Sequence, residues 1–215
     1  MQKVRVGVLG SGDVGRVLAA GFVGLGHEVK IGSRDPGKLQ DWADSAGSQA
    51  STGTFAEAAA FGDIVVLATL GVATPDVIQS VGPDAFAGKV VIDTTNPLDF
   101  SKGMPPTLTV GTTDSLGEMI QRLLPNAKVV KAFNTVGNPH MVNPQFPGGP
   151  PDMFLCGNDD GAKRIVSQIC EHFGWGVIDI GGIEGSRYLE PMCLTWVLHG
   201  VRSGSWNHAF KMLKR

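Results

Sequence analysis

Residues 4–34 read VRVGVLGSGDVGRVLAAGFVGLGHEVKIGSR, and the pattern of apolar residues and glycines in them indicates the fold class. An apolar strand over residues 4–9 runs into a glycine-rich turn, and the spacing predicts an amphipathic helix over 13–25 and a second strand over 27–31. A strand, a tight turn and a helix in this order are typical of the first unit of a parallel α/β sheet.

The turn carries a GxGxxG pattern, Gly10-Ser11-Gly12-Asp13-Val14-Gly15. Gly10 permits the tight turn, Gly12 lets the backbone approach a pyrophosphate, and Gly15 lets the helix pack closely on the strand. The phosphates would rest on free N–H groups at the helix N-terminus. The motif therefore predicts a dinucleotide site, and the alternative is an ordinary strand–helix turn.

The end of the second predicted strand indicates which dinucleotide is bound. NAD sites place an Asp or Glu about twenty residues beyond the glycines, to bind the ribose hydroxyls. Here Gly32-Ser33-Arg34 occupies that position. Ser33 offers a hydroxyl, Arg34 a planar fork suited to a phosphate, and Lys38 a further cation, whereas Asp35 lies beyond the strand and could cap the following helix. These residues favour the 2′-phosphate of NADP(H).

Strands and helices continue to alternate along the chain. Further strands are predicted at residues 64–68, 89–93 and 128–133, with helices at 36–46, 54–61, 74–81 and 115–124; Thr54, Thr74 and Ser115 are the expected caps. This order predicts an α/β fold, a Rossmann-type doubly wound parallel sheet with helices on both faces.

Residues 134–151 are rich in Asn, Pro and Gly and interrupt the alternation. A smaller block follows, with strands expected at 152–156 and 176–180, a helix at 159–173, and helical segments from 187 to the end. The sequence thus predicts an NADP-binding region, 1–135, and a C-terminal α/β extension, 136–215, that packs on it as one compact unit and forms a second-substrate cleft.

Small polar residues follow the two central strands. Thr69-Leu70-Gly71 and Thr94-Thr95-Asn96-Pro97 lie where open α/β sheets bind their ligands, outside the carboxyl ends of the strands. We expect Thr69, Leu70, Asn96 and Pro97 to meet the ribose and nicotinamide, although such residues also form ordinary turns.

Composition argues against several classes of function. The net charge is −2 and no basic stripe is present, so a nucleic-acid partner is not expected. No apolar run reaches the roughly twenty residues of a membrane span, and a strand pattern begins at once where a signal peptide would lie. The three cysteines and five histidines show no metal-ligand spacing, which predicts a cytoplasmic protein with reduced thiols and no metal.

With these features the sequence resembles the coenzyme F420-dependent NADP oxidoreductase family, whose nucleotide-binding part is shared with the cytosolic domain of membrane ferric reductases. The resemblance covers nearly the whole chain. Beside the glycine motif and the segment around Arg34 it rests on Asp93-Thr94-Thr95-Asn96-Pro97-Leu98, Lys131-Ala132-Phe133-Asn134-Thr135, Cys156-Gly157-Asn158-Asp159, Ser186-Arg187-Tyr188-Leu189-Glu190-Pro191 and Ala209-Phe210-Lys211.

The resemblance implies hydride transfer between nicotinamide C4 and C5 of a deazaflavin, with NADP(H) as cofactor and F420 as co-substrate. It assigns Ser11, Ser33, Arg34 and Lys38 to the 2′-phosphate, and the turn Asn134-Thr135-Val136 to the nicotinamide and the second ligand's pocket. Such a reaction needs positioning and exclusion of water more than acid–base groups. F420 carries an acidic tail, and loops 99–113 and 137–151 contain Lys102 as their only Lys or Arg.

Two other functions remain open. One is reduction of a small imine or carbonyl compound, for which His140, beside the presumed nicotinamide, is the one candidate proton donor; the Tyr-x-x-x-Lys pattern is absent because Met192 stands where the lysine would be. The other is a non-catalytic NADP(H)-binding sensor. The apolar C-terminal segments predict a homodimer.

Overall fold

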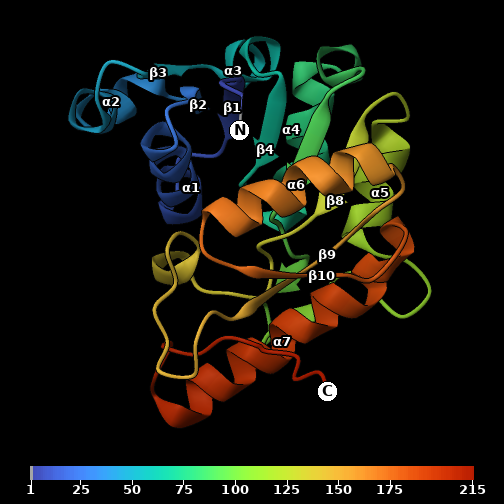
Figure 1. Ribbon diagram of the computed structural model, residues 1–215. Coiled ribbons are helices and arrows are strands. Elements are labelled where there is room, and N and C mark those ends of the chain that lie inside the picture. The colour runs from blue at the N-terminus through green and yellow to red at the C-terminus, as the bar shows by residue number, and fades with distance from the viewer. Residues whose placement is uncertain (1) are drawn as a thin grey trace.

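We describe residues 2–215 from a computed structural model, in which one sheet of eight strands forms the centre of the molecule (Figure 1). Its order is β10-β9-β8-β5-β4-β1-β2-β3, and every neighbouring pair is parallel except β8 and β9. The strands are β1 (Arg5–Leu9), β2 (Glu28–Gly32), β3 (Ala50–Gly53), β4 (Ile64–Leu67), β5 (Val90–Asp93), β8 (Lys128–Lys131), β9 (Asp152–Gly157) and β10 (Gly176–Asp179).

The order of the strands confirms the predicted Rossmann-type α/β fold. The two strands expected in the C-terminal extension join this same sheet, and β9 enters it antiparallel to β8 after the long connection between them. The sequence does not predict β3, because its residues Ala-Ser-Thr-Gly lack the apolar pattern of a strand. This strand lies at the edge of the sheet and is only partly buried.

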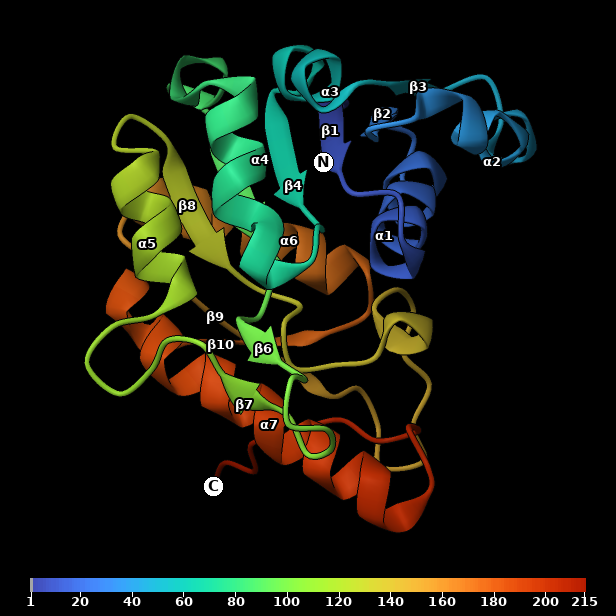
Figure 2. The same ribbon diagram turned by 180° about the vertical axis from the view of Figure 1, so that it is seen from behind.

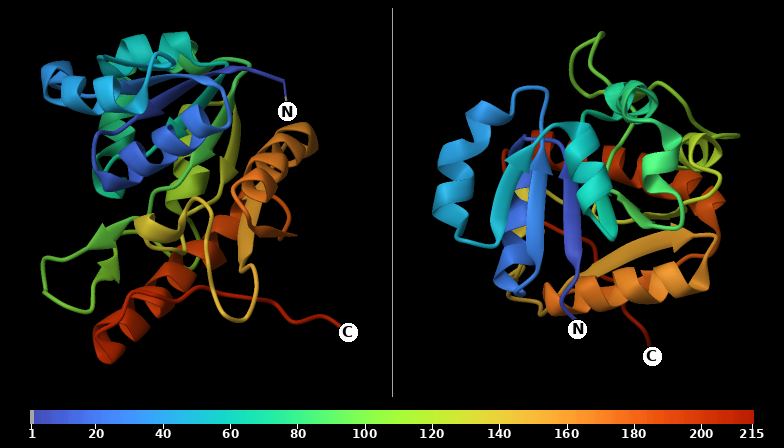
Figure 3. Two further views of the ribbon diagram at one scale, coloured as in Figure 1. Left: turned by 60° about the vertical axis from the view of Figure 1, so that its left-hand side comes forward. Right: turned by 90° about the horizontal axis from the view of Figure 1, so that it is seen from above.

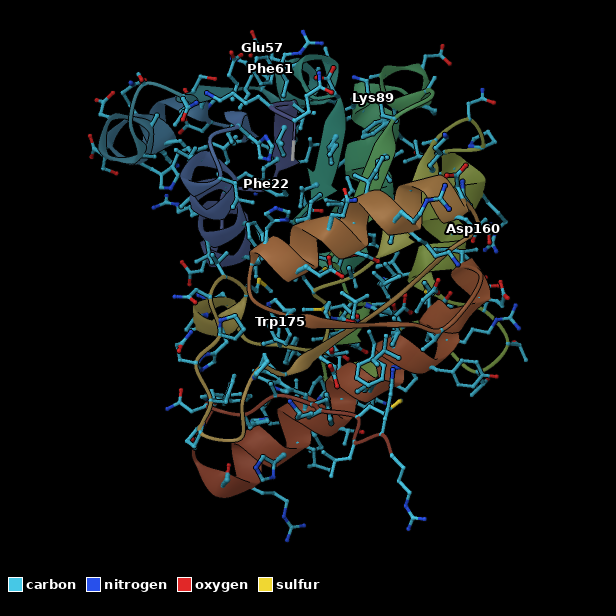
Figure 4. The ribbon with its side chains drawn as sticks, in the orientation of Figure 1. Phe22, Glu57, Phe61, Lys89, Asp160 and Trp175 are labelled. Carbon is cyan, nitrogen blue, oxygen red and sulfur yellow. The ribbon has the colours of Figure 1, made fainter. Side chains whose placement is uncertain are left out.

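Helices cover both faces of the sheet, as a doubly wound topology requires. Apolar residues of α1 (Asp13–Gly24) and α6 (Asp160–His172) pack on one face, and those of α3 (Phe55–Phe61), α4 (Thr74–Val81) and α5 (Leu116–Leu123) pack on the other (Figures 1 and 2). Phe22 and Trp175, both marked in Figure 4, belong to the larger of these two cores. The short α2 (Gln40–Ala46) lies beside β3.

Two elements lie beyond the carboxyl ends of the central strands. The long helix α7 (Ser186–Ser203) and the hairpin of β6 (Leu98–Asp99) and β7 (Thr107–Leu108) occupy this side of the molecule (Figures 2 and 3). The remaining short turns are 3-10 helices: η1 (Pro36–Leu39), η2 (Gly71–Ala73), η3 (Pro83–Phe86), η4 (Asn138–His140) and η5 (Ile183–Gly185). The carboxyl edge of the sheet is therefore partly covered by later parts of the chain.

The ends of the helices match the predicted caps unevenly. Thr54 forms a full capping box with Glu57, which is labelled in Figure 4, and Ser115 Oγ accepts the N–H of Glu118. The prediction for Thr74 is wrong, since it is the first residue of α4 and its hydroxyl donates to Leu70 O. The prediction of helix to the C-terminus is also wrong, because Gly204 adopts φ +66° and ends α7.

Residues 205–215 run back along the molecule as an extended segment. Their backbone is held by Asp152 at the start of β9, whose N–H donates to Phe210 O and whose carboxylate accepts the N–H of Met212. Trp196 of α7 and His208 hold each other reciprocally, through Trp196 Nε1 to His208 O at 2.9 Å and a contact of His208 Nε2 with Trp196 O at 2.9 Å. These hydrogen bonds take the place of the helical backbone hydrogen bonds that were predicted from the sequence for this segment.

Candidate functional site

The turn after β1 gives each glycine of the motif a separate role. Gly10 has φ +134°, and a Cβ there would overlap Ala68 O at the end of β4. A Cβ on Gly15 would overlap Gly10 O, so this glycine brings α1 onto the turn. A Cβ on Gly12 would meet no atom within 4 Å. Packing thus requires the outer glycines, whereas Gly12 leaves an open backbone face where a pyrophosphate would approach.

The N-terminus of α1 opens onto the same turn. Gly12 is its N-cap and supplies no side-chain hydrogen bond, so no side chain satisfies the N–H groups of the first turn. Arg16 Nε donates to Ser11 O at 3.0 Å and holds the preceding loop in place. A helix end that is not capped by its own side chains is a favourable place for an anion.

The end of β2 brings Ser33 and Arg34 beside this turn, because Gly10 N donates to Gly32 O at 3.1 Å. Ser33 is buried and its Oγ accepts the N–H of Asp35. Arg34 is exposed and makes no hydrogen bond or ion pair with any residue from 2 to 215. Lys38 Nζ lies 3.3 Å from Asp35 Oδ2, so the aspartate pairs with the lysine and does not cap η1 as expected.

The predicted cofactor residues after β4, β5 and β8 form a continuous line along the carboxyl edge. Gly10 contacts the end of β4, and a Cβ on Gly71 would overlap Asn96 O after β5. Asn96 Nδ2 in turn donates to Asn134 O after β8 at 2.8 Å. The fold therefore brings together the sequence-predicted residues Thr69, Leu70, Asn96, Pro97, Asn134, Thr135 and Val136 at one side of the sheet.

Asn96 and Asn134 bind each other in both directions. Asn134 Nδ2 donates to Asn96 Oδ1 and to Leu189 O of α7, each at 2.9 Å. Because both amide hydrogens of Asn134 point at carbonyl oxygens, the orientation of this side chain is fixed. Its Oδ1 is buried and has no hydrogen-bond partner among the described residues. Phe133, with φ +61°, turns the chain out of β8 into this position.

A buried ionic cluster lies behind the two asparagines, and sequence reasoning missed it. Lys131 Nζ lies 2.7 Å from Asp93 Oδ2 and 3.0 Å from Glu190 Oε1, and it donates to Thr95 O at 2.7 Å. All three charged side chains are fully buried, with at most 1% exposed. Burial by itself lowers the pKa of Lys131, but the two carboxylates outweigh it and raise that pKa above its ordinary value. Lys131 is therefore an ammonium.

Two backbone N–H groups stabilise the buried charge of the second carboxylate, Glu190. Glu190 Oε2 accepts the N–H of Leu116 and Oε1 that of Gly117, at 3.0 and 2.9 Å, so the carboxylate caps the N-terminus of α5. Nearer the surface, Arg187 forms a two-pronged ion pair with Glu118, which holds the pKa of that carboxyl below its usual range. The segments that carried the family resemblance around residues 93, 131 and 190 thus meet in one place.

The remaining candidate groups are otherwise engaged or buried. His140 Nε2 contacts Asn207 Oδ1 at 3.1 Å and its ring lies against Phe146, so its role as a proton donor stays a prediction. Burial raises the pKa of Cys156 to about 11 and that of Cys193 to about 12, so both thiols are protonated at neutral pH. Among residues 2–215, no set of three or more His, Cys, Asp or Glu side chains gathers as a metal site, and no helix has the length and apolarity to cross a membrane.

Comparison with known proteins decides the family. The family described as NADP oxidoreductase, coenzyme F420-dependent, matches residues 5–97. The F420-dependent NADP reductase of Methanocaldococcus jannaschii is 31% identical over 201 residues, which cover 88% of this chain and 89% of that protein. The chain belongs to the coenzyme F420-dependent NADP oxidoreductase family. It is therefore an NADP-dependent oxidoreductase.

Further similar proteins include two solved structures and one longer relative. A putative F420-dependent NADP reductase from Arthrobacter sp. FB24 is 40% identical, with a TM-score of 0.93 over 98% of this chain and 100% of that one. Metalloreductase STEAP3 of Rattus norvegicus is 29% identical over 88% of this chain, but this chain spans only 36% of its length. An imine reductase from Aspergillus terreus, 15% identical with a TM-score of 0.68 over 95% of this chain and 64% of that one, shares the fold alone.

Two glycine substitutions should separate binding from folding. We expect Gly12→Ala to lower NADPH affinity roughly tenfold or more, a loss of about 1.4 kcal/mol, because the added methyl occupies the open face. Its unfolding free energy should fall by no more than about 1 kcal/mol. Gly15→Ala should instead lower stability by about 1–3 kcal/mol, since its methyl overlaps Gly10 O. Calorimetric titration and urea unfolding measure both; a Gly12→Ala protein that binds NADPH normally would contradict this account.

Proposed function

We propose that the chain transfers hydride between NADP(H) and coenzyme F420 or a related flavin-like acceptor. The observation that carries the proposal is the line of polar turns along the carboxyl edge, from the open glycine at residue 12 to the paired Asn96 and Asn134. At one end of this line lies Arg34, which has no ion-pair partner among residues 2–215, and at the other lies Asn134 Oδ1, which accepts no hydrogen bond from those residues. It matches a ligand with phosphates at one end and a carboxamide at the other.

Arg34 and Ser33 are the proposed contacts of the 2′-phosphate. Arg34 has no partner among residues 2–215, so its guanidinium can turn toward a ligand without breaking an ion pair. Lys38 is already paired with Asp35 and its side chain is 80% exposed, which makes it a weaker, screened contributor. Ser11, at the mouth of the glycine turn, would complete the phosphate contacts.

At the other end, the turns carrying Asn96 and Asn134 are the proposed contacts of the nicotinamide. Asn134 Oδ1 is an acceptor without a partner, and the N–H groups of a carboxamide would supply the missing donor. The nicotinamide, when bound, supplies the hydride at its C4. The residues of the chain would hold the ring at the edge of the sheet, and the C-terminal portion, residues 136–215, would form the wall of the acceptor cleft.

The proposed acceptor needs no proton donor from the protein, and the titratable side chains identified at this edge already have partners. Asp93, Lys131 and Glu190 are paired with one another, and the ring of His140 contacts Asn207 and Phe146. The side chains identified at this edge therefore position a ligand more than they move protons. Transfer of hydride to C5 of a deazaflavin, with the accompanying proton drawn from solvent, suits such a site.

The proposed reaction is tested by mixing the purified chain with NADPH and oxidised F420. We expect loss of the visible absorbance of the deazaflavin with NADPH and little with NADH in a parallel sample. If NADPH binds tightly and the absorbance stays constant, F420 is not the acceptor. A flavin, an imine and a carbonyl compound tested in turn, with His140→Ala beside the wild type, then identify the alternative substrate class.

Replacing Arg34 should change the preference between the two nicotinamide cofactors. Because a charge-assisted hydrogen bond contributes about 1.5–3 kcal/mol, Arg34→Gln should weaken NADPH binding roughly ten- to hundredfold and leave NADH binding unchanged. Lys38→Gln should have a smaller effect, and Arg164→Gln, an exposed arginine on α6, should have none. Equal losses for NADPH and NADH in Arg34→Gln, measured by titration, would show that residue 34 does not read the 2′-phosphate.

A further inference from the structure

We propose that Glu190, far along the chain on α7, is a positioning residue for the nicotinamide end of the site. It would act through Lys131 and through the backbone of α7, and it would touch neither ligand. The inference rests on the proposed function, since it takes the turns of Asn96 and Asn134 as the contacts of the nicotinamide. Its basis is the chain of buried contacts that leads from the Glu190 carboxylate to both of those turns.

The first route runs through Lys131 to the turn after β5. Glu190 Oε1 holds Lys131 Nζ at 3.0 Å, and the same ammonium donates to Thr95 O at 2.7 Å. Thr95 directly precedes Asn96, and its N–H and hydroxyl are both held by Asp93 Oδ1. The ammonium is surrounded by Asp93, Glu190 and Thr95, so losing the Glu190 acceptor lets it shift relative to Thr95 O, the carbonyl of the peptide bond that leads into Asn96.

The second route runs along the backbone of α7 to the turn after β8. Leu189, the neighbour of Glu190, accepts the second amide hydrogen of Asn134 on its carbonyl oxygen at 2.9 Å. Glu190 itself anchors this part of α7 by accepting the N–H groups of Leu116 and Gly117 at the start of α5. The orientation of Asn134, and with it the direction of its free oxygen, therefore depends on where residue 190 holds the helix.

The burial of this cluster makes the coupling strong. Two carboxylates and one ammonium lie in the interior with at most 1% exposure, so water cannot replace a lost partner. Glu190→Gln keeps the size of the side chain, but its NH2 group must face Lys131 or a backbone N–H, all of which are donors. The substitution therefore removes one acceptor from the centre of the cluster, and both routes are affected together.

The test compares two ligands that differ at the nicotinamide end. We expect Glu190→Gln to weaken NADPH binding but to change the affinity for 2′,5′-ADP, which lacks the nicotinamide half, by less than twofold. The rate of hydride transfer at saturating substrates should fall roughly tenfold or more, a larger factor than the loss of NADPH affinity, because small misplacement of reacting atoms is costly. Glu190→Asp, which keeps the charge, should recover part of the rate.

The matched control is Glu118→Gln, which breaks the neighbouring link between α5 and α7 at Arg187 but leaves the Lys131 cluster intact. It should bind both ligands and turn over like the wild type.

Equal weakening of NADPH and 2′,5′-ADP by Glu190→Gln, or an unchanged rate in the folded variant, would overturn the inference. If Glu190→Gln does not fold, the same two comparisons are made with Glu190→Asp, where the smaller selective losses must still appear. Failure of wild-type F420 reduction would refute the proposed reaction, whereas the pair of binding measurements would still decide the role of Glu190.

Discussion

The ammonium of Lys131 is the interaction on which the carboxyl edge of this protein depends. It ends β8 opposite Asp93, which ends β5, and the two residues are partners in the register of these strands. A charge buried this deeply is costly unless it is paired and hydrogen-bonded, and Glu190 of α7 joins Asp93 and Thr95 O around it. The cluster thereby links α7 to the carboxyl ends of β5 and β8.

The phosphate end of the site obeys a different constraint, close approach of backbone to backbone. Gly10, Gly15 and Gly71 each lie where a Cβ would overlap a carbonyl oxygen of a neighbouring segment, and these contacts connect the ends of β1, β4 and β5. Gly12 alone among the motif glycines faces open space. One end of the edge is thus shaped by glycines beside the proposed phosphate site, and the other by charges that fix two asparagines. These two features position backbone and amide groups along the edge and leave the charged side chains of the cluster paired with one another.

The α/β fold and the phosphate end of the candidate site could be predicted from the sequence, because they depend on local patterns. The glycine motif, Arg34 in place of an acidic residue, and the alternation of strands and helices are all read within short windows. The Lys131 cluster could not be predicted in this way, because its members come from three distant segments. The available signal was that Asp93 and Lys131 each follow two or more buried β-branched residues at the end of a strand. The reversal of β9 and the extended tail after Gly204 were missed because both depend on tertiary pairing, in the tail's case with Asp152.

Isotopic labelling distinguishes direct transfer of hydride at this edge from any indirect reduction of the acceptor. NADPH carrying deuterium at C4, prepared separately for each face of the ring, is incubated with the chain and oxidised F420, and the reduced deazaflavin is analysed by mass spectrometry. Our account predicts that the deuterium from one face, and not the other, is found on the acceptor, because fixed turns around Asn96 and Asn134 present a single face of the nicotinamide. Reduced F420 without deuterium from either label would contradict direct transfer.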